Sequence, residues 1–216
     1  MKNKVAFLFD KSNLWIEEYL YLFNFQKYKK KYQIKLFKNT KNIINFDIVF
    51  VISYTKILNE KFLKKNKLSL IPHPSKLPKD KGFAPIHNAV LNNKNNFFIS
   101  LIKAEREVDS GDIFLQKKYK LKGTELMKEL REIQAKAVFQ IISDFLTDYP
   151  KVKFKKQVGK SNFNKKRRPD ESELSIKKTI LSQFNLLRVC DNERYPAFFV
   201  HKGKKYILKI YKEEFK

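Results

Sequence analysis

Short apolar runs separated by stretches of helix length constrain the fold of this chain more than any other feature. The strongest runs occupy residues 4–10, 46–53 and 68–72, with a shorter one at 33–37. A run without polar alternation is typical of a strand covered on both faces, as in a parallel sheet with helices on either side. Helical patterns at 14–23 and 58–63 separate the runs. The sequence therefore predicts an α/β fold with a mostly parallel sheet.

The first helical pattern carries a start signal. Asn13 precedes it, and Asn side chains commonly accept a hydrogen bond from the first turn of a helix. Glu17 and Glu18 lie near the positive end of the helix dipole. We therefore expect a helix over 14–23 that is capped by Asn13.

The composition is that of a folded protein with a sizeable core. Its 216 residues are 43% hydrophobic and 14% aromatic, which suits one main domain with a small appendage. No stretch reaches the roughly 18–20 uncharged apolar residues of a membrane span, and Asp10 interrupts the N-terminus before a signal-peptide core develops. We expect a cytoplasmic protein without a membrane partner. Cys190 is the single cysteine, which excludes a disulfide framework or CxxC metal site, and we expect no bound metal.

The net charge of +25 raises the question of a nucleic-acid partner. Only six of the 47 basic residues are arginine, and the other 41 are lysines spread along the chain. Arginine supplies the planar fork that reads phosphates and base edges, so a nucleic-acid-binding chain is expected to use more of it. The charge pattern therefore does not favour nucleic acid as a partner.

His73 stands where a predicted strand ends, because Pro72 and Pro74 restrict the backbone on either side. In open α/β sheets, ligands bind beyond the carboxyl ends of the strands. A single loop histidine is more often structural, so a functional role requires a partner. After a helix at 84–91 and a strand at 97–102, the acidic, glycine-containing segment 105–113 precedes another strand. A carboxylate of that segment is expected to face His73.

Three blocks in order resemble the signature of the folate-dependent formyltransferases. They are His73-Pro-Ser-Lys-Leu-Pro78, Lys81-Gly-Phe-Ala-Pro-Ile86 and Val108-Asp-Ser-Gly-Asp-Ile113. The family pairs a histidine with an aspartate at the separation of 36 residues that joins His73 to Asp109. The resemblance extends over about residues 4–210. It implies a Rossmann-like formyltransferase core and the use of N10-formyltetrahydrofolate as cosubstrate.

By this resemblance, His73 donates a hydrogen bond to the oxyanion of the tetrahedral intermediate, and Asp109 orients the histidine and helps to accept the amine proton. The sequence departs from the family at Ile71, where an asparagine is usual. Ser69 is a candidate replacement if a local bulge brings it near, and a backbone amide or Asn88 are alternatives.

The folate pocket is carried over from the family segment that follows the central strand and from the loop before Asp109. The implied contacts are Tyr54, Lys56, Ile57, Leu58, Glu105 and Val108. For Ile57 and Leu58, packing against the helix that follows is an equal alternative.

The remainder of the chain begins with an amphipathic helix at 123–150, whose apolar stripe is expected to be core. A basic stretch at 151–166, a helix at 175–189 and a hairpin at 198–208 with Gly203 in its turn follow. We expect a formyltransferase catalytic domain at 1–150 and a small C-terminal helix and β-hairpin subdomain at 151–216.

Two C-terminal blocks, residues 163–174 and 184–198, resemble the nucleotide-sugar N-formyltransferase branch. This implies formylation of a nucleotide-linked amino sugar, such as a UDP- or dTDP-sugar, in polysaccharide biosynthesis, and a possible homodimer. The implied substrate contacts are Lys81, Arg167, Arg168, Asn185, Arg188, Asn192 and Tyr195. Methionyl-tRNA formylation is an alternative, although only 66 residues follow residue 150. A noncatalytic polyanion- or ligand-binding relative is another.

Overall fold

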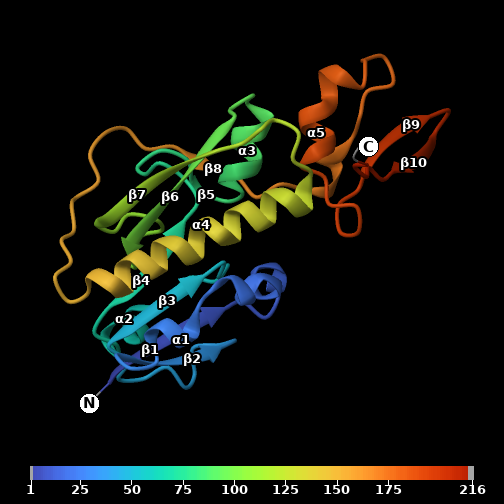
Figure 1. Cartoon of the computed structure of the whole chain (residues 1–216). Coiled ribbons are helices and arrows are strands. Elements are labelled where there is room, and N and C mark those ends of the chain that lie inside the picture. Colours follow the sequence, from blue (N-terminus) through green and yellow to red (C-terminus); the bar gives the residue numbers. More distant parts are fainter. Residues whose placement is uncertain (1, 214–216) are drawn as a thin grey trace.

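The central feature of the structure is a six-stranded mixed sheet. The computed structural model describes residues 2–213. The strands follow the order β2-β1-β3-β4-β6-β7 (Figure 1). They span Asn3–Phe9 (β1), Tyr32–Phe37 (β2), Ile48–Ile52 (β3), Ser69–His73 (β4), Asn96–Lys103 (β6) and Ile113–Lys120 (β7). Pairings from β2 to β4 are parallel, whereas those of β6 with β4 and β7 are antiparallel. The predicted α/β fold with a mostly parallel sheet is confirmed.

Strand β1 shows why the central strands have unbroken apolar sequences. Val5 and Phe7 belong to the larger core cluster, together with Phe145 of the long helix. Ala6 and Leu8 alternate with them and belong to a second cluster. Because successive side chains of a strand point to opposite faces, the two clusters lie on opposite sides of the sheet. Both faces of β1 are therefore covered by apolar side chains.

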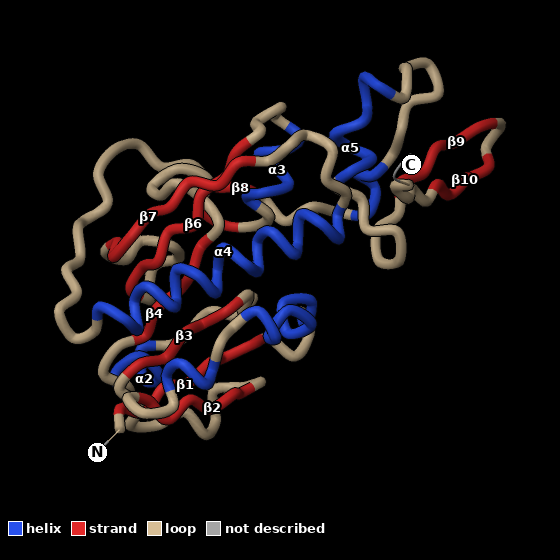
Figure 2. The backbone as a smooth tube through the Cα atoms, viewed as in Figure 1, coloured by secondary structure: helices blue, strands red, loops and turns tan. Residues whose placement is uncertain are grey.

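Helix α4 (Met127–Asp148) packs against β4, β6 and β7, and Figure 2 shows it crossing the sheet. Four residues of its predicted stripe are buried: Leu130, Ala137, Ile141 and Phe145. The helices before it are η1 (Leu14–Leu22), α1 (Phe25–Tyr28), α2 (Glu60–Lys64) and α3 (Pro85–Leu91). The predicted role of the stripe in the core is confirmed.

The predicted capped helix at 14–23 is wrong in two respects. The segment Leu14–Leu22 is a 3-10 helix, and Asn13 makes no side-chain cap. The Asn13 amide instead donates to the carbonyl and hydroxyl oxygens of Ser53, at 3.1 and 3.0 Å. A long-range pair of hydrogen bonds thus replaces the local cap and joins the loops that follow β1 and β3.

After α4 the chain returns along the sheet. Lys155 forms an antiparallel bridge with Ile113, and β8 (Phe163–Asn164) pairs in parallel with β5 (Lys81–Gly82). The following elements are η2 (Pro169–Ser172), η3 (Leu181–Gln183), α5 (Phe184–Arg188), β9 (Ala197–His201) and β10 (Lys204–Leu208). The predicted hairpin is confirmed, with Gly203 in its turn at φ 72°. The division of the chain at residue 150 stays a prediction.

The helix predicted at 175–189 is shorter than expected, since only η3 and α5 are helical. The Gln183 side chain accepts a hydrogen bond from the Ser175 backbone amide and donates to the Lys178 and Thr179 carbonyls. These bonds close residues 175–179 into a turn, which competes with helix formation.

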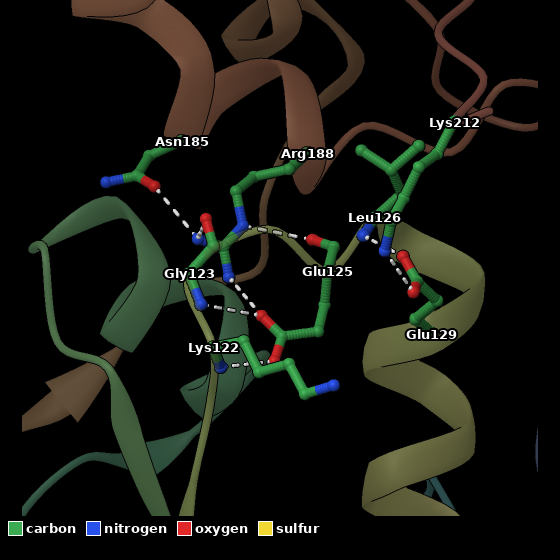
Figure 3. Close-up of polar contacts among 8 residues, drawn as sticks. All are labelled: Lys122, Gly123, Glu125, Leu126, Glu129, Asn185, Arg188 and Lys212. Atoms are coloured by element: carbon green, nitrogen blue, oxygen red, sulfur yellow. Dashed lines mark hydrogen bonds and ion pairs between the residues drawn. The ribbon is translucent and has the colours of Figure 1, made fainter. Parts of the chain in front are cut away.

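A buried ion pair joins α5 to the loop before α4 (Figure 3). Nη2 of Arg188 lies 3.1 Å from Oε2 of Glu125, and its Nε donates to the Glu125 carbonyl at 3.0 Å. The exposed fractions are 2% for Arg188 and 4% for Glu125. Burial raises the pKa of Glu125, but hydrogen bonds from the amides of Lys122 and Gly123 and the charge of Arg188 hold it below its usual value.

Within residues 2–213, no helix is long and apolar enough to cross a membrane.

Candidate active site

His73 is the last residue of β4 and is only 5% exposed. Its Nε2 lies 3.1 Å from the carbonyl oxygen of Asp80, and its Nδ1 lies 3.4 Å from Oδ1 of Asp109. Because a carbonyl oxygen only accepts hydrogen bonds, Nε2 carries hydrogen in this arrangement. The structure thus brings together the histidine and the aspartate that the sequence pairs.

Asp109 is held on its other side by β5. Its Oδ2 accepts a hydrogen bond from the backbone amide of Gly82 at 2.9 Å. Asp109 is 8% exposed and adopts a left-handed φ of 52°, which aspartate tolerates better than most residues. One carboxylate therefore bridges His73 and β5.

Gly111 lets the loop that carries Asp109 approach β6. A Cβ atom on Gly111 would lie 1.9 Å from the carbonyl oxygen of Lys103, a backbone atom that no rotamer change can move. We expect Gly111→Ala to lower the free energy of unfolding, measured in urea, by about 3 kcal/mol or more.

Gly203→Ala is the matched control for that substitution. Nothing lies within 4 Å of a Cβ at Gly203, so only its φ of +72° opposes the change. We expect a loss of about 1–2 kcal/mol. Equal losses in the two variants would contradict the close approach at Gly111.

Asp10 organises the loops that follow β1 and β3. Its carboxylate accepts hydrogen bonds from the backbone amides and hydroxyls of Ser12 and Thr55. Burial raises the pKa of Asp10, but these four hydrogen bonds outweigh burial and hold it well below its usual range. Because β1, β3 and β4 are parallel neighbours, these loops share the carboxyl edge of the sheet with His73.

Asp10→Asn is expected to destabilise the fold at neutral pH. The folded-state pKa lies below the ordinary value of 3.8, so the carboxylate stabilises the fold above that pH, and the effect is lost as pH falls through the folded-state pKa. We expect a loss of about 1–3 kcal/mol at neutral pH. Urea denaturation at about pH 7 and about pH 3 measures both values, and a difference from wild type that fails to shrink in acid would contradict the assignment.

The predicted folate contacts lie on two neighbouring loops. Arg106 Nη1 lies 3.6 Å from Oε1 of Glu60, which joins loop 104–108 to the start of α2. Ile57 and Val108 are 77% and 44% exposed. The other predicted contacts on these loops that face solvent are Lys56 and Glu105.

Leu58 and Tyr54 pack inward from the same loop. Leu58 is 8% exposed and belongs to the core cluster of Phe62 in α2, so the packing alternative describes its side chain. Tyr54 is partly buried against that cluster, and burial followed by the charge of Asp10 raises its pKa.

Ser69 does not replace the missing asparagine. It begins β4, a continuous strand from Ser69 to His73 without the expected bulge. A rise of about 3.3 Å per residue separates the two by about 13 Å. Ile71 packs against the second core cluster. The amide of Asn88 donates to the carbonyls of Phe83 and Ala84 in its own helix start.

Two predicted substrate contacts have polar atoms that already bond within the protein. Arg188 is buried against Glu125, so it is not available to a diphosphate. The Asn192 amide donates to the Ile210 carbonyl at 2.8 Å and accepts from the Ile210 amide at 3.1 Å. Both side chains fasten the C-terminal segment.

The other predicted substrate contacts differ in accessibility. The Arg168 side chain is 72% exposed and pairs with Asp170, and Tyr195 is 47% exposed. The remaining side chains are engaged: Arg167 with the Glu171 carbonyl, Asn185 with Asn93, and the buried Lys81 with the Phe163 ring.

Sequence reasoning missed three groups that surround His73 and Asp109. They are the Asp80 carbonyl, the Gly82 amide and the side chain of Gln157, which donates to the Asp109 carbonyl at 2.8 Å. Backbone groups carry no residue-type signal, and Gln157 lies in a basic stretch without a motif. In the described part of the chain, no group of three His, Cys, Asp or Glu side chains is placed to hold a metal ion.

Comparison with known proteins assigns the chain to a family. The family described as "Formyl transferase" matches residues 3–145, which include His73 and Asp109. The chain belongs to the formyl transferase family. The chain is 28% identical over 177 residues to the methionyl-tRNA formyltransferase of Caldicellulosiruptor saccharolyticus, an alignment that covers 79% of the chain and 55% of that relative. It therefore spans about half the length of the curated relative.

Two solved structures share the fold of this chain. A sugar N-formyltransferase from Shewanella sp. matches with a TM-score of 0.71 and 17% identity, over 100% of both chains. HypX from Aquifex aeolicus, in complex with tetrahydrofolic acid, matches with a TM-score of 0.74 and 15% identity, over 95% of this chain and 37% of that chain. At these identities the likeness concerns the fold alone.

Proposed function

We propose that this formyl transferase moves a formyl group from N10-formyltetrahydrofolate to the amine of a nucleotide-linked amino sugar. The observation that carries the proposal is the buried His73–Asp109 pair, in which Nδ1 lies 3.4 Å from Oδ1 at the carboxyl edge of the sheet. The family match over residues 3–145 includes both members of the pair.

In the proposed reaction, the acceptor amine attacks the formyl carbon, and negative charge develops on the formyl oxygen. Collapse of the intermediate breaks the bond to N10 of the folate, which takes up a proton while the amine loses one. His73 donates through Nε2 to the formyl oxygen, in a hydrogen bond shared with the Asp80 carbonyl that orients the ring. Asp109 holds the ring at Nδ1 and accepts the amine proton.

The loops around residues 54–57 and 104–108 are the proposed folate site. Their connection through Arg106 and Glu60, at 3.6 Å, supports a shared site, and the exposed Ile57 and Val108 offer apolar surface to a ring system. The HypX fold neighbour binds tetrahydrofolic acid, which supports the same cosubstrate here.

The nucleotide-sugar acceptor is supported by the C-terminal part of the chain. Residues 163–174 and 184–198 resemble the sugar branch of the family. The Shewanella sugar N-formyltransferase matches over the full length of both chains, and a methionyl-tRNA formyltransferase from Clostridium thermocellum matches over 99% of this chain and 94% of that chain, so the resemblance of these two blocks carries the choice of a sugar acceptor. Arg168 and Tyr195 are the proposed contacts that remain accessible.

Methionyl-tRNA is the second candidate acceptor. The name of the curated relative favours it, and the net charge of +25 is compatible with a polyanionic substrate. The two acceptors are expected to differ in salt dependence, because binding of tRNA weakens strongly as the salt concentration rises.

An acceptor panel distinguishes the two candidates. Release of tetrahydrofolate is followed by absorbance with UDP-, dTDP- and GDP-linked amino sugars, and in parallel with methionyl-tRNA. Turnover with one sugar class supports the proposal, and Arg168→Ala is then expected to raise KM for that sugar. Turnover with methionyl-tRNA alone would replace the sugar by tRNA as the acceptor.

A further inference from the structure

Residues 155–164, here called the return segment, lie against the candidate site although they come after α4. Lys155 bridges to Ile113 at the start of β7, and Asn164 of β8 pairs with Gly82 of β5. In Figure 1 the orange chain that follows α4 runs back past β7 to β8, and the return segment is its second half. It lies beyond residues 3–145, the part matched by the family.

Gln157 of the return segment holds the backbone on both sides of Ser110. Its Nε2 donates to the carbonyl oxygens of Asp109 and Gly111, both at 2.8 Å. Its Oε1 is buried without a hydrogen-bond partner among the described residues. The unpaired acceptor is unfavourable, and the two donated bonds are the hydrogen bonds that hold this side chain. They also fix the position from which Asp109 reaches His73.

Asn162 holds the other partner of His73. Its Oδ1 accepts from the Asp80 amide at 3.0 Å, its Nδ2 donates to the Asp80 carboxylate at 3.1 Å, and its carbonyl accepts from the Lys81 amide at 3.0 Å. Asp80 has a left-handed φ of 58°. Its carbonyl is the group that faces Nε2 of His73. Asn162 thus orients the acceptor on the reactive side of the ring.

We propose that Gln157 and Asn162 are positioning residues for the His73–Asp109 pair. The proposal rests on the proposed function, because it assigns the two residues to the same reaction. Gln157 acts through the Asp109 backbone and Asn162 through Asp80. The return segment therefore aligns the imidazole of His73 at both ring nitrogens. Displacement of the return segment changes the geometry of the Nε2–H donor but removes no reacting group.

The expected effect is on kcat. A misplacement of about 1 Å at a reacting group can cost about 100-fold in rate. Gln157→Met keeps the length of the side chain and removes the donor, so we expect kcat to fall about 10- to 100-fold while KM for donor and acceptor stays within about threefold. Asn162→Ala, at an exposed position, should lower kcat about tenfold.

Gln140→Met is the matched control. Gln140 is exposed on α4, and its Nε2 donates to Asp144 at 2.9 Å, away from His73. It should leave kcat and KM unchanged. Thermal unfolding of all three variants separates positioning from stability, because Asn162→Ala should melt close to wild type.

A second readout does not depend on turnover. The ring 15N signals of His73 in the full chain, assigned with His87→Gln and His201→Gln, report the hydrogen bonds of both ring nitrogens. We expect Gln157→Met and Asn162→Ala to shift these signals and Gln140→Met to leave them in place. If wild type turns over none of the acceptors, the proposed function fails, yet the His73 signals still decide the positioning role.

Two results would overturn the proposal. The first is unchanged His73 signals in both Gln157→Met and Asn162→Ala. The second is a kcat within about twofold of wild type in both variants under conditions where wild type turns over, because the lost bonds would then have no effect on alignment.

Discussion

His73→Ala is expected to lower kcat for formyl transfer by about 100- to 1000-fold, the usual effect of removing one donor to an oxyanion. The imidazole is 5% exposed and lies between the Asp80 carbonyl and the Asp109 carboxylate, so no neighbouring side chain takes over its position. Steady-state kinetics with the acceptor identified in the panel measure the effect. KM should change little, because the interaction strengthens only as charge develops on the formyl oxygen.

Asp109→Asn and His201→Ala complete that experiment. The amide of the Asp109→Asn variant would retain an acceptor for the Gly82 amide, so the fold should persist, but it supplies no negative charge to Nδ1. Its kcat should therefore also fall by at least about 100-fold, because the variant lacks the proposed proton acceptor. His201 is exposed on β9, and His201→Ala should behave as wild type. A His73→Ala enzyme within about tenfold of wild type would contradict the assigned role.

The second large effect concerns the stability of the fold. Glu125→Ala is expected to lower the free energy of unfolding by about 3–5 kcal/mol, because it leaves the guanidinium of Arg188 buried without a counter-charge. Arg188 is 2% exposed, and its Nη2 and Nε both contact Glu125. Urea denaturation at neutral pH measures the loss.

The double variant Glu125→Ala/Arg188→Met separates the ion pair from packing. With both charges removed, the loss should be clearly smaller than the sum of the single losses. Glu193→Ala is the comparison at the surface, where Lys209 lies 2.8 Å from Glu193 with 42% and 74% of the side chains exposed. It should cost no more than about 1 kcal/mol. Additive losses at Glu125 and Arg188 would contradict a coupled buried pair.

Unbroken apolar runs in the sequence predicted the fold, because the central strands are covered on both faces. Val5 and Phe7 pack on one side of the sheet and Ala6 and Leu8 on the other, and this leaves an unbroken apolar run in the sequence. His73 is the last residue of β4, and Pro74, which has no backbone amide to donate, follows it. The position of His73 at a strand end and the family spacing were therefore sufficient to predict that His73 and Asp109 lie close together.

Residue type alone did not distinguish a ligand contact from a structural bond. Arg188 and Asn192 have the chemistry to bind a nucleotide sugar, but Glu125 and the Ile210 backbone occupy them. Ser69 failed as a replacement because strand geometry, not sequence proximity, sets its distance from His73. Gln157 gave no signal, since its partners are backbone carbonyls brought close only by the tertiary fold.

The most direct test of formyl transfer by the His73–Asp109 pair follows the formyl carbon itself. Wild-type protein and His73→Ala are incubated with N10-formyltetrahydrofolate labelled at the formyl carbon and with the acceptor, and the acceptor is analysed by mass spectrometry. We predict that wild type places the label on the acceptor amine and that His73→Ala places almost none there. Equal labelling by both proteins would contradict the assigned role of His73, and no labelling of any sugar or tRNA acceptor would contradict formyl transfer by this chain.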